Sequence, residues 1–401
     1  MIAEGGTGKS FLVSRWPAEL KDKKPAPYAG AERIFTWSFY SQGSKGQITS
    51  SEGFFSDLLR SFGEKSEDYD SLSRANKALE LVSKETMILV LDGVKSLQNP
   101  PGHTDAGHFH DRTMGDFINR LAGQPWPGLV IVTSRQRLVE LAAGEGEAIL
   151  HVDVESLNPK DGVKLLTSLD VTGPDEEMCR AVEDMAGHAF GLVLLGHYLV
   201  DVVGDPDVTK RDHVKLLKAH VKGAEKAKAT LRAYADWFGA ESAETAMLHL
   251  LGLLDRPVPM ATLRALVAEP LIAGPTEPSY VADAPPLAMV LRRLEELKLI
   301  TRPDAETLDG HLLVREYFGA ALEKNSPDVW KQAHSRMFDY FCTIPDKDQP
   351  DGEAGLLPLY QSLHHGVAAG RAQEALFDIY YQRINRNGRG YGTHQLSLFS
   401  T

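Results

Sequence analysis

The chain begins with MIAEGGTGKS (residues 1–10), and the last six letters of this stretch are typical of a phosphate-binding loop between a buried strand and a helix. In such a loop the glycines let backbone N–H groups point at phosphate oxygens, the lysine reaches the β- and γ-phosphates, and the hydroxyl ligates magnesium. The full pattern, G-x-x-x-x-G-K-[ST], would have glycine at position 3, where this chain has Ala3. The predicted nucleotide-binding residues are Gly5, Gly6, Thr7, Gly8, Lys9 and Ser10, of which Ser10 is also a predicted Mg²⁺ ligand.

Strand-like stretches alternate with helical ones through the first third of the chain. Long apolar runs are typical of parallel strands that are covered on both faces. Between them, SEGFFSDLLRSFG (51–63) places its apolar residues on one helical face, and a helix should run from Lys9 to about Arg15, ending before Pro17. This alternation predicts an α/β unit around a parallel sheet. The predicted strands are RIFTWSFY (33–40), TMILVLD (86–92), GLVIVTSR (128–135) and AILHVDV (148–154).

From Ser156 the apolar spacing becomes helical. Between residues 244 and 318, the order of helix, turn, two helices and a short β wing is that of a winged-helix fold. The stretch 356–384 predicts a helical hairpin that could begin TPR-like repeats, because a lone hairpin cannot bury its apolar face. The fold class is α/β, then mostly α. The predicted domains are a P-loop nucleotide-binding domain (1–152), a helical domain (153–230), a winged-helix domain (231–322) and a helical hairpin region (323–401).

The composition excludes several classes of protein. A net charge of -12 argues against broad electrostatic binding to nucleic acid or to an anionic membrane. The two cysteines, Cys179 and Cys342, lie far apart and imply no disulfide framework, which fits a reducing cytosol. No apolar run approaches the roughly 20 residues that cross a bilayer. We therefore expect a cytoplasmic protein of several domains.

Two predicted strands end in residues that suit a nucleotide site. Magnesium bound to phosphates needs a second anchor, typically an Asp at the carboxyl end of a neighbouring strand, and MILVLD ends with Asp92. A residue that senses the γ-phosphate often ends the adjacent strand, and VIVTSR ends with Arg135. Asp92 and Arg135 are therefore the predicted catalytic residues, and Asp92 is the second predicted Mg²⁺ ligand.

These motifs resemble the STAND class of P-loop NTPases, the signal-transduction ATPases with numerous domains, whose NB-ARC members include plant resistance proteins and apoptotic activators. The residues that carry the resemblance are TWSFYSQGS, LVLDGVKSLQNPPG, VIVTSR, GHAFGLVLLGHYL and GHLLVREYF, in this order. The resemblance implies a nucleotide domain, a helical domain and a winged-helix domain closed over ADP, with an effector module upstream and a repeat sensor downstream. It also implies self-oligomerisation with ATP, in signalling or in bacterial defence.

The resemblance gives roles to individual residues. His311 in GHLLVREYF matches the family histidine that contacts the β-phosphate of ADP, although Leu312 stands where the family has Asp. GHAFGLVLLG matches the segment beside adenine, with Ala189 in place of the family proline. Lys9 and Ser10 would hold phosphates and Mg²⁺, Asp92 would be the magnesium-side acid, and Arg135 would be the γ-phosphate sensor.

Hydrolysis is expected to be slow or absent. Gly93 follows Asp92 where many relatives have a second acid, and Lys95 stands where close relatives often have Glu. Positioning and polarising the attacking water depends on such a group. Glu140 or Glu145 could substitute, and the sequence leaves this open.

The start of the chain raises a separate expectation. In the family, the strand before the phosphate loop lies between the strand that ends at Arg135 and the last strand of the sheet. Only four residues precede the loop here, and a missing strand would leave two neighbours with unpaired backbone groups. The sequence therefore predicts that Met1 is an internal start of a longer protein. The alternative is that another chain or a later segment fills the gap.

Two other functions remain open. The first is a winged-helix transcription regulator with a vestigial P-loop, although Glu295 and Glu296 accompany Arg292, Arg293 and Lys298 on the expected recognition helix, so specific DNA binding is not favoured. The second is a scaffold that binds ATP or ADP without hydrolysis. The loop GHTDAGHFHD (102–111) is rich in His and Asp but lacks a regular ligand spacing, so a metal site there is not favoured either.

Overall fold

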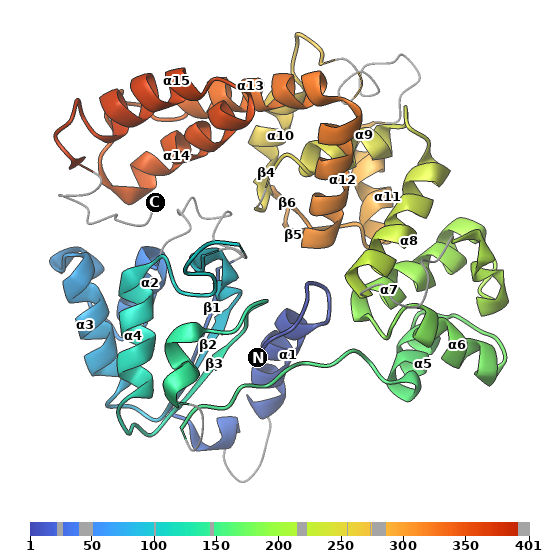
Figure 1. Cartoon of the computed structure of the whole chain (residues 1–401), viewed down its shortest axis with the longest axis horizontal. Coiled ribbons are helices and arrows are strands. Elements are labelled where there is room, and N and C mark those ends of the chain that lie inside the picture. Colours follow the sequence, from blue (N-terminus) through green and yellow to red (C-terminus); the bar gives the residue numbers. More distant parts are fainter. Residues whose placement is uncertain are drawn as a thin grey trace.

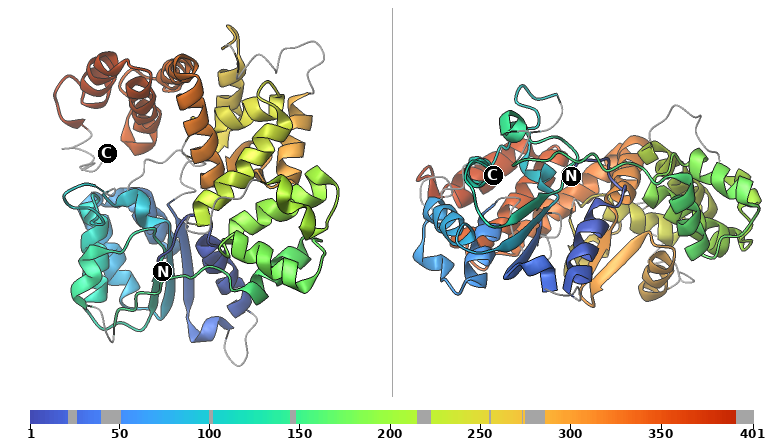
Figure 2. Two further views of the ribbon diagram at one scale, coloured as in Figure 1. Left: turned by 45° about the vertical axis from the view of Figure 1, so that its right-hand side comes forward. Right: turned by 90° about the horizontal axis from the view of Figure 1, so that it is seen from below.

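The chain folds into an α/β unit followed by helices that lead round to the C-terminal helices (Figure 1). In both Figure 1 and Figure 2 the last helices, drawn in red, lie on the same side of the molecule as the α/β unit. The computed structural model describes residues 1–21, 27–39, 51–99, 102–144, 148–214, 223–254, 256–272, 274 and 286–391.

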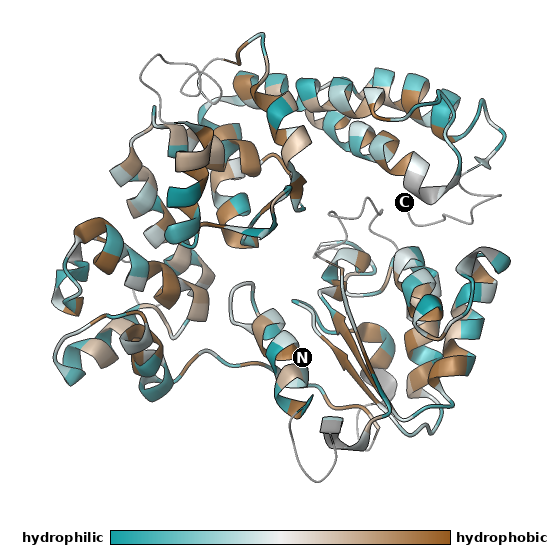
Figure 3. Ribbon diagram, turned by 180° about the vertical axis from the view of Figure 1, so that it is seen from behind, coloured by the Kyte–Doolittle hydropathy of each residue, from teal (hydrophilic) through white to brown (hydrophobic). Residues whose placement is uncertain are grey.

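A parallel sheet forms the centre of the α/β unit. Its named strands are hydrogen-bonded in the order β1-β2-β3, and all residues of β2 are buried, as the brown colour of the strands in Figure 3 reflects. Strands buried on both faces need continuous apolar runs, which is why the sequence located them. The strands are β1 (Arg33–Ser38), β2 (Met87–Asp92) and β3 (Leu129–Val132), and they confirm three of the four predicted strands.

The first three residues lie beside the end of β3. The backbone N–H of Ser134 donates to the carbonyl of Met1 (3.0 Å). On its other side, Ile2 donates to the carbonyl of Val152 (2.8 Å) and accepts from Val154 (2.8 Å). Residues 1–3 therefore occupy the place expected for the strand before the phosphate loop.

The prediction of a regular strand at 148–154 is wrong. Its pairing within the described residues is an isolated parallel bridge between Ile2 and Asp153. The physical reason is the short partner, because residues 1–3 offer too few backbone groups for a ladder.

Helices cover both faces of the sheet (Figure 1). On one face, Val13 and Leu20 of α1 (Lys9–Lys21) pack with Ile88 and Val90 of β2. The other face packs against an aromatic-rich core that includes Phe54. The helices of that face are α2 (Glu52–Ser61), α3 (Ser71–Val82) and α4 (Arg112–Ala122).

The predicted end of the first helix before Pro17 is wrong, because α1 continues to Lys21. Proline removes one backbone donor from a helix, but it does not remove the apolar face beyond it. Leu20, one turn further on, is buried against the sheet, so tertiary packing extends the helix past the proline.

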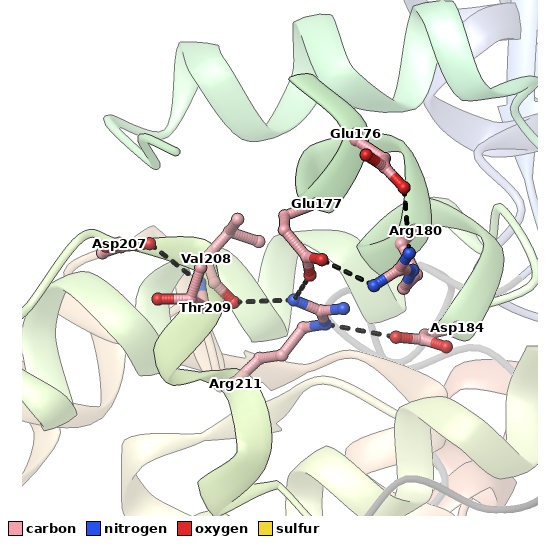
Figure 4. Close-up of polar contacts among 8 residues, drawn as sticks. All are labelled: Glu176, Glu177, Arg180, Asp184, Asp207, Val208, Thr209 and Arg211. Carbon is pink, nitrogen blue, oxygen red and sulfur yellow. Dashed lines mark hydrogen bonds and ion pairs between the residues drawn. The ribbon is translucent and has the colours of Figure 1, made fainter. Parts of the chain in front are cut away.

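The second part of the chain is helical, and a network of charged side chains ties part of it together (Figure 4). The buried guanidinium of Arg211 donates to Glu177 (2.9 Å) and to Asp184 (3.1 Å). Its neighbour Arg180 also pairs with Glu177 (2.6 Å). The helices here are α5 (Pro159–Ser168), α6 (Asp175–Asp184), α7 (Ala189–His197) with a π-helical continuation (Tyr198–Val203), and α8 (Gly223–Phe238).

A small antiparallel sheet follows, with the strand order β4-β6-β5. One continuous apolar core runs from Leu166 of α5 through this region to Phe341, which lies in the later helix α13 (Pro327–Thr343). The domain boundaries expected at 230 and 322 remain predictions. The elements are α9 (Ala243–Leu251), β4 (Val258–Pro259), α10 (Met260–Val267), α11 (Leu287–Glu296), β5 (Ile300–Asp304), β6 (Thr307–Gly310) and α12 (Leu312–Asn325).

The chain ends in helices that include the predicted hairpin at 356–384. Gly370, with φ of 81°, lies at its turn, where a positive φ favours glycine. None of the helices among the described residues has both the length and the apolar character needed to cross a membrane. The helices are α13 (Pro327–Thr343), α14 (Gly352–Ala368) and α15 (Ala372–Glu374), which continues as a π-helical segment (Ala375–Ile384).

Candidate nucleotide-binding site

The phosphate loop leads directly into α1, which begins at Lys9. Gly6 and Gly8 have φ of 82° and 98°, values that L side chains rarely adopt. The hydroxyl of Thr7 donates back to the carbonyl of Glu4 (3.1 Å) and closes the loop. The sequence thus places glycine at the positions where the backbone needs it.

Lys9 lies inside the loop. Its Nζ donates to the carbonyl oxygens of Ala3 (2.7 Å) and Glu4 (2.6 Å), and the side chain is buried. Burial, and then the nearby charge of Arg135, lower the pKa of Lys9 from its ordinary value of 10.5 to about 8. An anionic group at the loop would favour the charged ammonium, so this lysine is suited to hold phosphates.

Ser10 and Asp92 meet at the end of β2. The Ser10 hydroxyl donates to Asp92 Oδ1 (3.0 Å), and the Thr133 hydroxyl donates to the same oxygen (2.5 Å). Thr133 also accepts from the backbone N–H of Gly93 (2.9 Å), which fixes the turn after the strand. The second oxygen of Asp92 receives no hydrogen bond from the described part of the chain.

This pair of oxygen donors fits Mg²⁺, which prefers carboxylate and hydroxyl oxygens together with phosphates and water. Ser10 Oγ and Asp92 are the residues that would hold the ion beside the loop. When bound, the ion would supply charge neutralisation for the phosphates. The two predicted Mg²⁺ ligands therefore lie together, on neighbouring elements.

Arg135, three residues beyond the end of β3, reaches across the loop to the helical part of the chain. A Cβ placed on Gly5 would lie 2.7 Å from a guanidinium nitrogen of Arg135, so the arginine lies directly against the loop. Its Nη1 donates to Glu316 Oε1 on α12 (3.1 Å). Burial, and then the nearby charge of Arg135, lower the pKa of Lys95.

His188 is a site residue that the sequence did not single out. Its Nδ1 accepts from the backbone N–H of Gly191 (3.0 Å), so Nε2 carries the proton and donates to the carbonyl of Gly5 (2.8 Å). The backbone N–H of Phe190 donates to the carbonyl of Gly6 (3.0 Å). Burial lowers the pKa of His188 and keeps the ring neutral at pH 7. The start of α7 is thus bonded to the phosphate loop.

His311 lies next to this contact. Its ring stacks on Phe190, with 3.7 Å between ring centroids and an interplanar angle of 20°. Its Nδ1 accepts from the backbone N–H of Leu313 and caps α12, which leaves Nε2 as the donor. Burial, followed by the charges of His188, Arg135 and Lys9, lowers the pKa of His311 to about 3. At neutral pH the ring is an uncharged hydrogen-bond donor.

Other candidates are engaged elsewhere. Glu140 Oε1 accepts from the backbone N–H of Phe109 (2.6 Å), and Glu145 lies outside the described residues. In the loop at 102–111, Asp111 caps α4 and His110 contacts the carbonyl of Ser96. Within the part of the chain that the structure describes, His, Cys, Asp and Glu side chains form no group of three that could hold a metal.

A phosphate loop before a helix, with polar residues at the ends of the neighbouring parallel strands, defines the class of P-loop NTPase folds. No family model matches the chain, and no curated protein matches it by sequence. Among solved structures, it is similar to a signal-transduction ATPase with numerous domains (STAND) that carries a tetratricopeptide repeat sensor, from Pyrococcus horikoshii. The TM-score is 0.53 at 16% identity, over 99% of this chain and 50% of that protein.

This likeness shows that the chain has the fold of a STAND-type P-loop ATPase. The chain spans about half the length of that structure. A Walker-type ATPase of Pyrococcus abyssi is also similar, at 15% identity over 79% of this chain and 89% of its own, but its TM-score of 0.35 is too low to support a structural argument.

Proposed function

We propose that this chain is the ATP- and ADP-binding switch of a STAND-type signalling ATPase. The observation that carries the proposal is that one small region contains a lysine inside a glycine loop, an oxygen pair suited to Mg²⁺ and an arginine that bridges to α12. These groups come from the start of α1, the end of β2 and the segment after β3, and all of them lie at the loop.

The arrangement supports a closed resting state. Arg135 on the α/β unit pairs with Glu316 on α12, and the ring of His311, which caps that helix, stacks on Phe190, whose backbone N–H is bonded to the loop. ADP in the loop would lie within reach of the neutral His311 donor, as the family resemblance implies. A γ-phosphate would compete with Glu316 for Arg135. ATP would then favour opening and self-oligomerisation, because a ligand shifts a two-state equilibrium only through its differential affinity for the two states.

Slow or absent hydrolysis is part of the proposal. Activation of an attacking water needs a carboxylate close to the γ-phosphate. Position 93 is glycine, with φ of 79°, and position 95 is lysine. Glu316 is paired with Arg135, and Glu140 accepts from a backbone N–H in another loop. These engagements support a switch in which bound nucleotide persists.

The helical parts suit the domains of such a switch. The order of α9, α10, α11 and the β4-β6-β5 sheet supports a winged-helix domain, and α13, α14 and α15 would begin a repeat sensor. The upstream effector, the NB-ARC relationship and a role in signalling or bacterial defence belong to the proposal as expectations from the resemblance.

Specific DNA binding by α11 finds little support. Arg293 pairs with Glu244 (2.7 Å) and lies over the Trp237 ring, and Arg292 pairs with Glu296 (2.9 Å). Charges that are already paired are poor candidates for phosphate contacts. If the protein bound a specific DNA site with a steep salt dependence, the transcription-regulator alternative would be favoured instead.

Calorimetric titration with Mg·ADP and Mg·ATP tests the proposal. Lys9→Ala should abolish binding of both nucleotides, because Lys9 Nζ is the cation inside the loop. Arg15→Ala is the matched control, because Arg15 lies on the same helix but is solvent-exposed and pairs only with Glu19 among the described residues. Equal affinities for the parent and Lys9→Ala, or no binding by the parent, would reject the proposal. Asp92→Ala should spare ADP and remove the Mg²⁺ dependence of ATP binding.

A further inference from the structure

A cavity of about 740 Å³ lies among α8, α9 and α12, three helices that pack against one another and lie side by side in Figure 1. Its size is within the usual range for sites that bind small molecules. No residue of the phosphate loop lines it, nor do His188 or His311. The cavity is therefore a separate site from the nucleotide site, and Glu316 is the lining residue that also contacts Arg135.

Four hydrogen-bond donors line this cavity without acceptors among the described residues. Two are the cations Arg232 of α8 and Lys324 of α12, neither of which has an acidic partner within ion-pair distance in the described ranges. The other two are the hydroxyl of Tyr317 and the ring of His249, and neither makes a hydrogen bond to a described residue. The two cations are exposed and can be hydrated, whereas Tyr317 and His249 are half-buried. Buried or half-buried polar groups are normally satisfied, so the latter two donors point to a ligand or to solvent.

The protonation states of the two half-buried donors suit an anionic ligand. Burial raises the pKa of Tyr317, so its hydroxyl keeps its proton at pH 7. Burial lowers the pKa of His249, so its ring is neutral and presents one N–H donor. Both groups can donate to an anion without first gaining or losing a proton.

The charge around the cavity contrasts with that of the whole chain. The protein carries a net charge of -12, yet this cavity gathers the cations Arg232, Lys324 and Lys228, the last paired with Glu225 (2.7 Å). Of the two lining carboxylates, Glu316 is already paired with Arg135, which leaves Asp236. Apolar surface comes from alanines of α8 and α12, because the ring of Phe318, which packs edge-on against His249, is itself almost completely buried.

We propose that this cavity binds a small organic anion, with its carboxylate or similar charged head at Arg232 and Lys324 and its apolar body against the alanines of α8 and α12. Tyr317 and His249 donate further hydrogen bonds to the head. This is a second ligand site, and it goes beyond the proposed nucleotide switch.

The probes for the test are 2-naphthoate and its neutral counterpart 2-naphthalenemethanol, titrated by calorimetry with and without saturating ADP. The naphthoate should bind at least tenfold more tightly than the alcohol, and ADP should not compete with it. Arg232→Gln should weaken naphthoate binding at least tenfold, and Tyr317→Phe should weaken it a few-fold. Arg292→Gln is the matched control, because Arg292 is an exposed arginine on α11 outside the cavity.

Equal affinity for the two probes, competition by ADP, or equal effects of Arg232→Gln and Arg292→Gln would overturn the proposal. Circular-dichroism melting of each variant verifies that the fold is retained, and Tyr317→Phe, which removes a single oxygen, provides a second variant. The experiment distinguishes a failure of this proposal from a failure of the proposed nucleotide switch. Lys9→Ala should lose nucleotide binding but keep naphthoate binding, because Lys9 does not line the cavity.

Discussion

Gly6→Ala should destabilise the α/β unit far more than Gly8→Ala, although both glycines lie in the same loop. Both have a positive φ, of 82° and 98°, so both substitutions introduce backbone strain of about 1–2 kcal/mol. The surroundings differ. A Cβ on Gly6 would lie 2.6 Å from Cε1 of His188 and 3.0 Å from Cβ of Phe190, whereas a Cβ on Gly8 would meet no atom within 4 Å.

The difference in the free energy of unfolding between the two variants measures the effect of the contact between the loop and α7. Overpacking of this kind costs about 1–3 kcal/mol. If His188 moved away to relieve it, the hydrogen bond to the Gly5 carbonyl would be lost, at about 1 kcal/mol. We therefore expect Gly6→Ala to lower the free energy of unfolding by about 2–5 kcal/mol, against about 1–2 kcal/mol for Gly8→Ala.

The assay is urea unfolding of the protein without nucleotide, followed by tryptophan fluorescence, since Trp16 and Trp37 lie in the α/β unit. With a difference of about 1–3 kcal/mol and a denaturant dependence of about 1–3 kcal/mol per molar urea, the midpoints of the two variants should differ by about 0.3–3 M. Equal midpoints would refute the close contact between Gly6 and His188. In the His188→Ala background, Gly6→Ala should cost less free energy of unfolding, because removing the His188 ring should relieve most of the clash.

Four further predictions concern charged groups. Bound nucleotide should return the pKa of Lys9 from about 8 toward 10.5, so calorimetry should find ADP affinity about tenfold weaker at pH 9 than at pH 7. A double-mutant cycle of Arg135→Ala and Glu316→Ala should give a coupling of about 0.5–1 kcal/mol in thermal unfolding that shrinks with added salt, as expected for a partly exposed pair. Since the folded-state pKa of His311 is depressed to about 3, its contribution to stability is complete above pH 6.5 and is lost as pH falls toward 3. His311→Asn, which keeps the helix cap, should therefore reduce the fall in melting temperature between pH 6.5 and pH 3. Arg211→Ala removes the partner that Glu177 and Asp184 share, although Glu177 keeps Arg180 (Figure 4), and should cost about 1.5–3 kcal/mol in urea unfolding. A loss below about 0.5 kcal/mol would contradict the burial of the Arg211 guanidinium.

The sequence predicted the sheet well because its strands are buried on both faces. MILVLD is apolar up to Asp92, and β2 consists of the same six residues. The segment 148–154 has a similar composition but forms only a bridge, because a strand depends on its partner as much as on its own residues. The end of α1 was missed for a related reason, since the burial of Leu20 outweighs the signal of Pro17.

Within the site, the residues of the loop were predictable from local pattern, and their long-range partners were not. Lys9, Ser10 and Asp92 belong to motifs whose spacing reflects backbone geometry. The contacts of His188 with Gly5 and of Arg135 with Glu316 join residues 183 and 181 positions apart, and no local periodicity encodes them. One available signal was the position of His188 directly before an apolar helix, where a side-chain acceptor can cap the first turn.

The charges around the phosphate loop would give the proposed switch a direction. Arg135 lies close enough to contribute to the lowered pKa values of Lys9, Lys95 and His311, so positive charge gathers at the loop and Glu316 offsets it only in part. The phosphates common to ADP and ATP would relieve the repulsion at Lys9. Only the γ-phosphate of ATP would compete with Glu316 for Arg135, and losing the 3.1 Å contact would remove one tie between the segment after β3 and α12. Arg135→Ala should therefore leave ADP affinity nearly unchanged and abolish ATP-driven self-association in light scattering, whereas an ATP response equal to that of the parent would show that the arginine does not read the third phosphate.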